Sequence, residues 1–218
     1  MTPKNTNGNS GKNPKDTNAT TTEDLPPANL YVDRMRAPQA LKAMLTNQAH
    51  ALIALEIALP AIDAAADAAY QRLKKSESGR LIYVGAGTSA RIGVQDGAEL
   101  LPTFNWPHHR TGFVIAGGEA ALLRAVENAE DSADSGSKQI ANLAVGQNDV
   151  VIGLTASGST VFTIAALTAA QQFGAVTIGV ANNPNTALLN AVSYPILLAT
   201  GAEIIAGSAR LQAGTAQK

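Results

Sequence analysis

The chain contains no cysteine, which excludes disulfides and thiolate metal sites. Histidine is also scarce: only His50, His108 and His109 occur, and a neighbouring pair in a loop favours surface chemistry over a metal site. No stretch reaches the roughly 18 uninterrupted apolar residues of a membrane span, and the polar N-terminus has no apolar signal core. We therefore expect a cytoplasmic protein with no metal, no redox cofactor and no membrane partner.

An excess of basic charge is missing as well, because the formal net charge is −1. Proteins that bind nucleic acids usually carry a basic field, so a nucleic-acid partner is not expected. Hydrophobic residues make up 45% of the chain and charged residues 15%, a balance typical of a compact domain. A chain of 218 residues is long enough for one domain with a sizeable core.

Composition divides the chain into a tail and a domain. Residues 1–28 are rich in Asn, Thr, Gly, Lys and Pro and have almost nothing to bury, which predicts a disordered polar tail. The domain is expected at residues 29–218. It opens with an N-terminal helical segment from Pro38 to Lys75, where apolar residues recur at helical spacing and Pro60 interrupts the pattern.

Beyond Gly79, short runs rich in Val and Ile alternate with helix-like stretches. The runs are RLIYVG, GFVIAGG, DVVIGLTASG, AVTIGVAN and YPILLAT, and the helix-like stretches lie at 90–101, 119–130, 135–144, 159–173 and near 185–191. This alternation predicts an α/β fold, a doubly wound parallel sheet of five strands flanked by helices. Ligands of such folds bind outside the carboxyl ends of the strands, near a switch in strand order.

Two loops that follow strands present hydroxyl groups beside helix starts. The first is GAGTS at 85–89, and the second is TASGST at 155–160. A helix N-terminus offers unpaired N–H donors to a phosphate, and Ser and Thr add further donors. Ser, Thr and Gly are also ordinary capping and turn residues, but two such loops at one sheet edge favour phosphate binding.

A dinucleotide is a weaker interpretation of the first loop. The second strand ends in VIAGGEAA without the acidic residue that would hold a ribose, since Glu119 begins the following helix. The chain also lacks the GxxxxGK[ST] pattern of a P-loop. The sequence therefore favours the single phosphate of a small sugar.

Four segments, GRLIYVGAGTSARIGVQDGAELLPTF, IAGGEAALLRAVENAEDS, DVVIGLTASGST and GSARLQAGTAQK, together resemble the sugar isomerase (SIS) domain. Within that group they are similar to the N-acetylmuramic acid 6-phosphate etherases, over roughly residues 79–218. The resemblance implies a carbon–oxygen lyase that cleaves the D-lactyl ether of this sugar phosphate in cytoplasmic peptidoglycan recycling and amino sugar catabolism. It also implies a homodimer and no cofactor.

The resemblance assigns catalytic roles to Glu99, in DGAELLPTF, and Glu130, in ENAED, which are 31 residues apart. Glu99 is expected to donate the proton to the leaving lactate, and Glu130 to handle the water step; the group that removes the C2 proton is left open. Phosphate and substrate binding are expected at both hydroxyl loops and at a closing segment, 207–216. These binding residues are Gly87, Thr88, Ser89, Ser157, Gly158, Ser159, Thr160 and Ser208, with Arg210 as a ligand contact or an ion-pair partner.

The sequence departs from the family pattern in four places. Asn47–His50 (NQAH) aligns where the family usually has an Asn followed closely by Glu-Asp, so the acidic pair is lost. Ser159-Thr160-Val161 replaces Arg-Thr-Pro in the second loop, and Ala209 and Gln212 replace a Thr and a Lys. The C-terminal helices usual in the family are expected to be absent, as in a fragment or a shortened paralogue.

Two other functions remain open at this point. SIS domains also serve as sugar-phosphate sensors in regulatory proteins, although no basic helix-turn-helix precedes this domain. An aldose–ketose isomerase acting on a related phosphosugar is the third interpretation, because it too removes a proton next to a carbonyl. The fold alone does not separate these functions.

Overall fold

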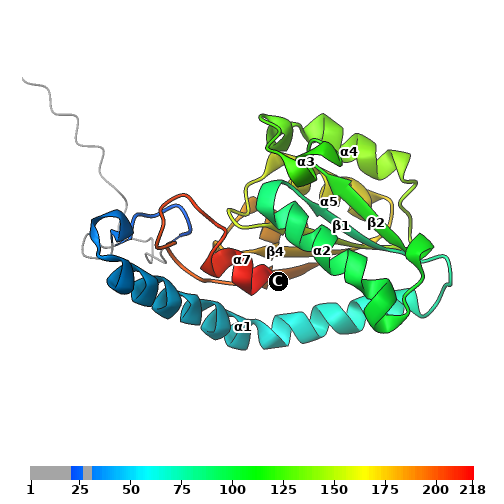
Figure 1. Ribbon diagram of the computed structural model, residues 1–218. Coiled ribbons are helices and arrows are strands. Elements are labelled where there is room, and N and C mark those ends of the chain that lie inside the picture. Colours follow the sequence, from blue (N-terminus) through cyan, green and yellow to red (C-terminus); the bar gives the residue numbers. More distant parts are fainter. Residues whose placement is uncertain (1–20, 27–30) are drawn as a thin grey trace, which may run out of the picture.

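The computed structural model describes residues 21–26 and 31–218 and has one sheet between two helical layers (Figure 1). Five parallel strands lie in the order β2-β1-β3-β4-β5. Their bounds are β1 Leu81–Gly85, β2 Thr111–Ile115, β3 Val150–Thr155, β4 Val176–Ala181 and β5 Tyr194–Leu197. The predicted fold class and all five predicted strands are confirmed. The switch in strand order falls between β1 and β3, as in flavodoxin-like sheets.

The helices form the two outer layers. They are α1 Ala37–Leu73, α2 Gly87–Phe104, α3 Ala120–Leu123, α4 Ala133–Asn142, α5 Val161–Gln172, α6 Ala187–Ala191 and α7 Gln212–Gln217, with 3-10 turns at Val32–Arg34, His108–Arg110 and Ala129–Asp131. α1, α2 and α7 pack on one face, whereas α5 covers the other face together with α4 and α6 (Figure 1). The central strands are covered on both faces, which explains their nearly continuous apolar sequences.

α1 is one continuous helix of 37 residues, so the expected interruption at Pro60 is wrong. Proline removes one N–H donor, which leaves the carbonyl of Glu56 without its intrahelical partner. Both residues are exposed, so water can replace that bond. Meanwhile Ala51, Ala54, Ala58 and Ala65 are buried on the inner face, and this packing runs along the helix past the proline.

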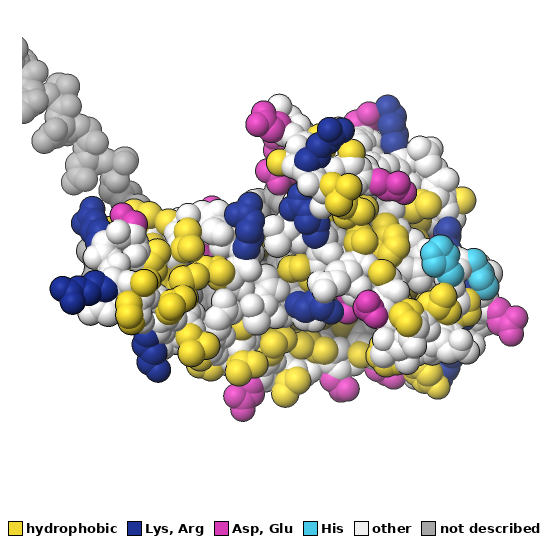
Figure 2. Space-filling model, viewed as in Figure 1, with side chains coloured by type: hydrophobic (Ala, Val, Ile, Leu, Met, Phe, Trp, Pro, Cys, Tyr) yellow, Lys and Arg dark blue, Asp and Glu magenta, His cyan; other side chains and the backbone are white. Residues whose placement is uncertain are grey.

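The outer face of α1 is unusually apolar. α1 is the one helix of the described residues that is long and apolar enough to cross a membrane by length and composition, and 22% of its most apolar window is buried. Figure 2 shows hydrophobic side chains along the outside of this helix. The most exposed aliphatic side chains are Leu41, Leu45, Leu52, Ile53, Ile57 and Leu59, which we call the α1 apolar face. Its inner face packs on β3, β4 and β5.

The helix expected at 119–130 is mostly absent. Only α3 and the turn at Ala129–Asp131 are helical there. Arg91 explains the early end of α3, because its Nη2 and Nε donate to the carbonyls of Ala121 and Leu122 at 2.8 and 3.0 Å. In a continuing helix those carbonyls would accept from residues 125 and 126. The chain instead forms a loop across the carboxyl edge of β2.

Part of the predicted tail packs against the domain. Thr22 is 1% exposed, its N–H donates to Oδ1 of Asn183 at 2.8 Å, and its Oγ1 accepts from Nδ2 of the same residue at 3.1 Å. Asn183 follows β4, so residues 21–26 lie against the carboxyl edge of the sheet. The rest of the predicted tail, residues 1–20 and 27–28, lies outside the described residues.

Candidate functional site

The two hydroxyl loops flank the switch in strand order. β1 and β3 are neighbours, with Gly85 opposite Leu154, so the loops that follow them leave the same edge side by side. One loop leads into α2 and the other into α5. Each helix therefore directs its unpaired N–H groups towards this edge, where the field of the helix favours an anion.

The first loop approaches its own helix closely. A Cβ at Gly85 would lie 3.0 Å from backbone atoms of Ala90, so the strand can meet the first turn of α2 only without a side chain there. Gly87 has a φ of +54° and open space around it. Gly87 and Thr88 line a pocket of about 260 Å³, whereas Ser89 is buried beneath and does not line it.

The second loop is a cluster of hydroxyl groups bonded to one another. Oγ1 of Thr155 lies 2.7 Å from Oγ1 of Thr160 and 3.3 Å from Oγ of Ser157, and Ser157 Oγ accepts from both N and Oγ of Ser159. Gly158 has a φ of +71°, and its carbonyl accepts from the N–H of Leu188 at 3.0 Å. The loop is therefore a fixed set of neutral donors at the start of α5.

Glu130 lies in the pocket beside the first loop. The 260 Å³ pocket is enclosed by the start of α2, the loop before Glu130 and one side chain from the segment after β5. Its charged lining residues are Arg91, Glu127, Glu130 and Arg210. Arg91 and Glu127 were not predicted as site residues. Arg91 stands one helical turn after Gly87, and this spacing in GTSARIG could have indicated it.

Glu99 is not in this pocket. It is an exposed residue of α2, twelve residues after Gly87, which is about 18 Å along a helix. Within one chain the structure does not bring Glu99 and Glu130 together. Glu99 lies near Asp96, which accepts a hydrogen bond from the hydroxyl of Tyr83 at 2.9 Å and forms an ion pair with Lys218 at 3.2 Å. Burial, followed by the charge of Asp96, raises the pKa of Tyr83.

The segment after β5 is anchored by a buried carboxylate. Glu203 is fully buried and accepts from the N–H groups of Gln212 and Ala213, at 3.3 and 3.0 Å, where α7 begins. Burial raises the pKa of the Glu203 carboxyl, and the backbone donors oppose that shift. Ser208 lies on the same segment but not in the pocket; its Oγ accepts from Nη1 of Arg210 at 3.4 Å.

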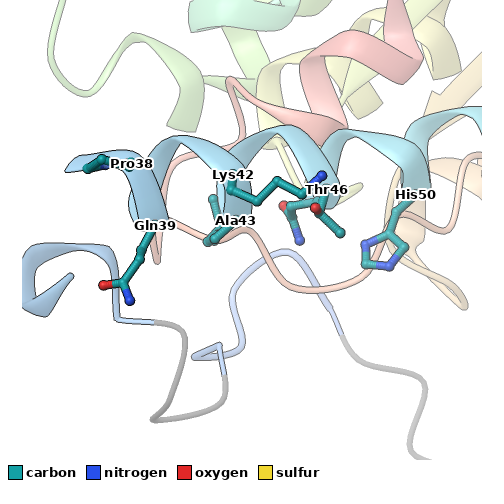
Figure 3. Close-up of a pocket in the computed structure, with 8 residues that line it drawn as sticks. Pro38, Gln39, Lys42, Ala43, Thr46 and His50 are labelled. Carbon is teal, nitrogen blue, oxygen red and sulfur yellow. The ribbon is translucent and has the colours of Figure 1, made fainter. Parts of the chain in front are cut away.

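A second hollow, of about 550 Å³, runs along the first turns of α1 (Figure 3). Its walls are mostly apolar and include Pro38, Ala43 and Ile204, with His50 at the far end. Ile204 belongs to the segment that carries Arg210, so this segment contributes to the lining of both hollows. The hollow holds none of the predicted site residues.

Residues 64–171 match the sequence family described as the glucokinase regulatory protein N-terminal SIS domain. The fold is shared with the phosphoheptose isomerases of Neisseria gonorrhoeae (TM-score 0.61, 21% identity, 83% of this chain and 93% of that one) and Francisella tularensis (0.60, 23%, 83% and 91%). At these identities the likeness concerns the fold alone.

Sequence similarity to curated proteins is much higher. The N-acetylmuramic acid 6-phosphate etherase of Deinococcus radiodurans is 45% identical over 90% of this chain and 64% of its own length. That of Pasteurella multocida is 40% identical over 94% of this chain and 67% of its own length. The chain thus spans about two thirds of the relatives it matches. It belongs to the N-acetylmuramic acid 6-phosphate etherase family.

Proposed function

We propose that the chain cleaves the D-lactyl ether of N-acetylmuramic acid 6-phosphate to give N-acetylglucosamine 6-phosphate and D-lactate. The setting would be cytoplasmic recycling of the cell wall. The observation that carries the proposal is the place of Glu130. In a chain 45% identical to an etherase, this carboxylate lines a pocket with Thr88 and the start of α2, beside the switch in strand order.

The chemistry calls for acid and base groups at C2 and C3 of the open-chain sugar. The C2 proton is acidic because it lies next to the C1 aldehyde. Once a base removes it, protonation of the ether oxygen releases lactate from C3, and water then adds to the unsaturated aldehyde. Two carboxyl groups with separated pKa values can perform these steps. Glu130 would guide the water step and Glu99 would protonate the leaving lactate.

The phosphate would lie at the hydroxyl loops. Ser157, Ser159 and Thr160 offer neutral donors, and Gly158 brings the backbone close. Gly87 and Thr88 add the start of α2 from the adjacent strand. Ser89 would support this loop from beneath rather than touch the phosphate, because it is buried outside the pocket.

A second subunit would supply the missing glutamate. Glu99 is exposed and lies about two turns beyond Arg91, the last residue of α2 that lines the pocket of its own chain. The exposed α1 apolar face lies on the same side of the sheet as α2, and large exposed apolar surfaces usually mark interfaces. We infer a homodimer in which each pocket combines its own Glu130 with Glu99 of the partner subunit.

Release of D-lactate from N-acetylmuramic acid 6-phosphate tests the reaction. Glu99→Gln and Glu130→Gln should each slow release by roughly 10²–10⁴-fold, the usual worth of a general acid or base. Asp131→Asn, an exposed neighbour outside the pocket, should keep the wild-type rate. A wild-type chain that releases no lactate, or glutamate variants that remain active, would contradict the proposal.

Mixing the two inactive variants tests the shared site. If each site combines glutamates from two chains, exchange of subunits creates mixed dimers with one intact site, and roughly one quarter of the wild-type activity returns. No recovery after exchange would place both glutamates in one chain.

Light scattering tests the dimer itself. Ile57→Glu, on the α1 apolar face, should give monomers, whereas Leu123→Glu, at a 95% exposed position on α3, should remain dimeric. A monomeric wild type would contradict the dimer. Binding of the wild type to phospholipid vesicles without self-association would also contradict it.

A non-catalytic sensor of sugar phosphates is the second candidate. The observation that favours it is the match of residues 64–171 to the SIS domain of a regulatory protein. A sensor would bind N-acetylmuramic acid 6-phosphate and gain thermal stability, yet would release no lactate.

A further inference from the structure

Two arginines face the same pocket as Glu130. Arg91 comes from the second turn of α2, and Arg210 from the segment after β5. Within the described residues neither guanidinium has a carboxylate within 4 Å, since the ion pairs found there join Arg80 to Asp149, Lys138 to Asp134 and Lys218 to Asp96. Both cations therefore remain available to an anion that enters the pocket.

The guanidinium of Arg91 is held in a fixed orientation. Its Nε and Nη2 donate to the carbonyls of Leu122 and Ala121, and the side chain is half-buried. Its Nη1 has no hydrogen-bond partner among the residues that the structure describes. A planar guanidinium that is oriented on one edge and free on the other suits a carboxylate.

Arg210 reaches the pocket from the segment between β5 and α7. Beyond it, α7 begins at the backbone N–H groups that Glu203 holds. The side chain of Arg210 is exposed, and the one hydrogen bond of its guanidinium within the described residues runs to Ser208 Oγ at 3.4 Å. This long bond to a neutral hydroxyl leaves most of its donors free.

The chemistry of the substrate decides which anion belongs here. N-acetylmuramic acid 6-phosphate has two anionic groups, the phosphate on C6 and the lactyl carboxylate attached through oxygen to C3. The reacting atoms are C2 and C3, so a glutamate that acts on them lies beside the lactyl group and away from the phosphate. The two arginines share the pocket of Glu130, and Gly87 and Thr88 of the first hydroxyl loop line one part of it. The loop at 155–160, which carries most of the proposed phosphate donors, lies outside the lining.

We propose that Arg91 and Arg210 bind the carboxylate of the lactyl group and so select the muramic sugar. This inference rests on the proposed function. The two cations would orient the ether for cleavage and would stabilise the negative charge that develops on the leaving oxygen. The product N-acetylglucosamine 6-phosphate lacks this carboxylate and would bind through its phosphate and ring alone.

Arg210→Gln tests the proposal, because the exposed side chain can be changed without disturbing the core. Dissociation constants are measured by calorimetry for N-acetylmuramic acid 6-phosphate and for N-acetylglucosamine 6-phosphate, with every protein, the wild type at position 210 included, carrying Glu99→Gln to suppress cleavage during the titration. We expect a loss of roughly 10–100-fold for the muramic sugar, the worth of a charged hydrogen bond, and unchanged affinity for the product. Arg124→Gln, which removes an exposed arginine of the neighbouring loop outside the pocket lining, should change neither.

A ligand that lacks the carboxylate charge allows the change in the ligand to be combined with the change in the protein. The primary amide of the lactyl carboxyl should bind the wild type as weakly as the acid binds Arg210→Gln, and the variant should bind acid and amide alike. Equal losses for the muramic sugar and the product would assign Arg210 to the phosphate and overturn the proposal. Unchanged affinity for both sugars would overturn it as well.

The same titrations separate this proposal from the turnover proposal. A wild type that releases no lactate but discriminates as described would contradict only the etherase reaction. A wild type that binds the product but not the muramic sugar would overturn the proposal that Arg91 and Arg210 bind the lactyl carboxylate. A wild type that binds neither sugar would overturn this proposal and the etherase reaction.

Discussion

Nδ1 of His50 lies 3.1 Å from Oε1 of Gln212 and so joins α1 to the start of α7. Gln212 is fully buried, and its Nε2 donates to the carbonyls of Gly201 and Ala202 at 3.2 and 2.6 Å. These bonds fix the orientation of the amide, so the imidazole must be the donor. Both residues occupy positions where the sequence departs from the family pattern, because an acidic pair is usual around His50 and a Lys at Gln212. A hydrogen bond between an imidazole and an amide therefore stands where the resemblance implies charged residues.

Gln212→Lys should destabilise the chain by about 3 kcal/mol, because it places an ammonium in a fully enclosed site without an acidic partner on α1. Adding His50→Asp supplies that partner. The double variant should therefore be more stable than the sum of the two single effects predicts, by a coupling free energy of about 1–3 kcal/mol. Urea denaturation of the wild type, the two single variants and the double variant measures this coupling. Gln172→Lys, at an exposed position of α5, should change stability by less than about 0.5 kcal/mol. Additive effects of the two substitutions would show that the positions are not coupled.

The sheet could be predicted because its signals are local. The central strands β1, β3 and β4 are short apolar runs that both layers cover, and a Gly, Ser or Asn follows each of β1 to β4 within two residues. The edge that carries the hydroxyl loops followed directly from the strand positions. Parallel strands have all their carboxyl ends at the same edge of the sheet, so Thr88 and Ser157 were expected at that edge.

The remaining features depend on contacts between distant residues. Nothing near 119–130 in the sequence indicates that Arg91 takes the carbonyls of α3, so the helix was predicted too long. The sequence likewise placed Glu99 near the site by resemblance, but the straight course of α2 carries it away from the pocket. Pro60 does not interrupt α1, because buried packing at residues 51–58 before it and at Ala65 after it compensates for one lost hydrogen bond.

Gly158→Ala should damage the hydroxyl loop. The φ of +71° disfavours any side chain by about 1–2 kcal/mol, and a Cβ would lie 2.4 Å from side-chain atoms of Thr186. We expect lower stability and at least tenfold weaker binding of N-acetylglucosamine 6-phosphate, measured by calorimetry. Gly146→Ala, where φ is not positive and the space is open, should leave binding unchanged. Normal binding by Gly158→Ala would remove this loop from the phosphate site.

The buried carboxyl of Glu203 should make stability depend on pH. Burial raises its pKa above the ordinary 4.5 in the folded state, so the folded chain holds this proton more tightly than the unfolded chain does. The favourable contribution is complete below pH 4.5 and is lost as the pH rises through the folded value. The stability of the wild type relative to Glu203→Gln should therefore fall as the pH rises above 4.5 in urea titrations. A rise over this range would mean that the N–H donors of α7 outweigh burial.

Thr163 has a hydroxyl with no partner in the part of the chain that the structure describes, although the residue is fully buried in α5. Thr163→Val keeps the shape and removes the unpaired oxygen, so the free energy of unfolding should rise by about 1 kcal/mol. Thr168→Val on the same helix removes a hydroxyl that donates to the carbonyl of Ile164 at 2.9 Å and faces solvent. That control should gain nothing, because its hydroxyl already has a partner and water access. If Thr163→Val instead lost stability, the hydroxyl must have a partner that the valine cannot replace, and a buried water would be the first to test.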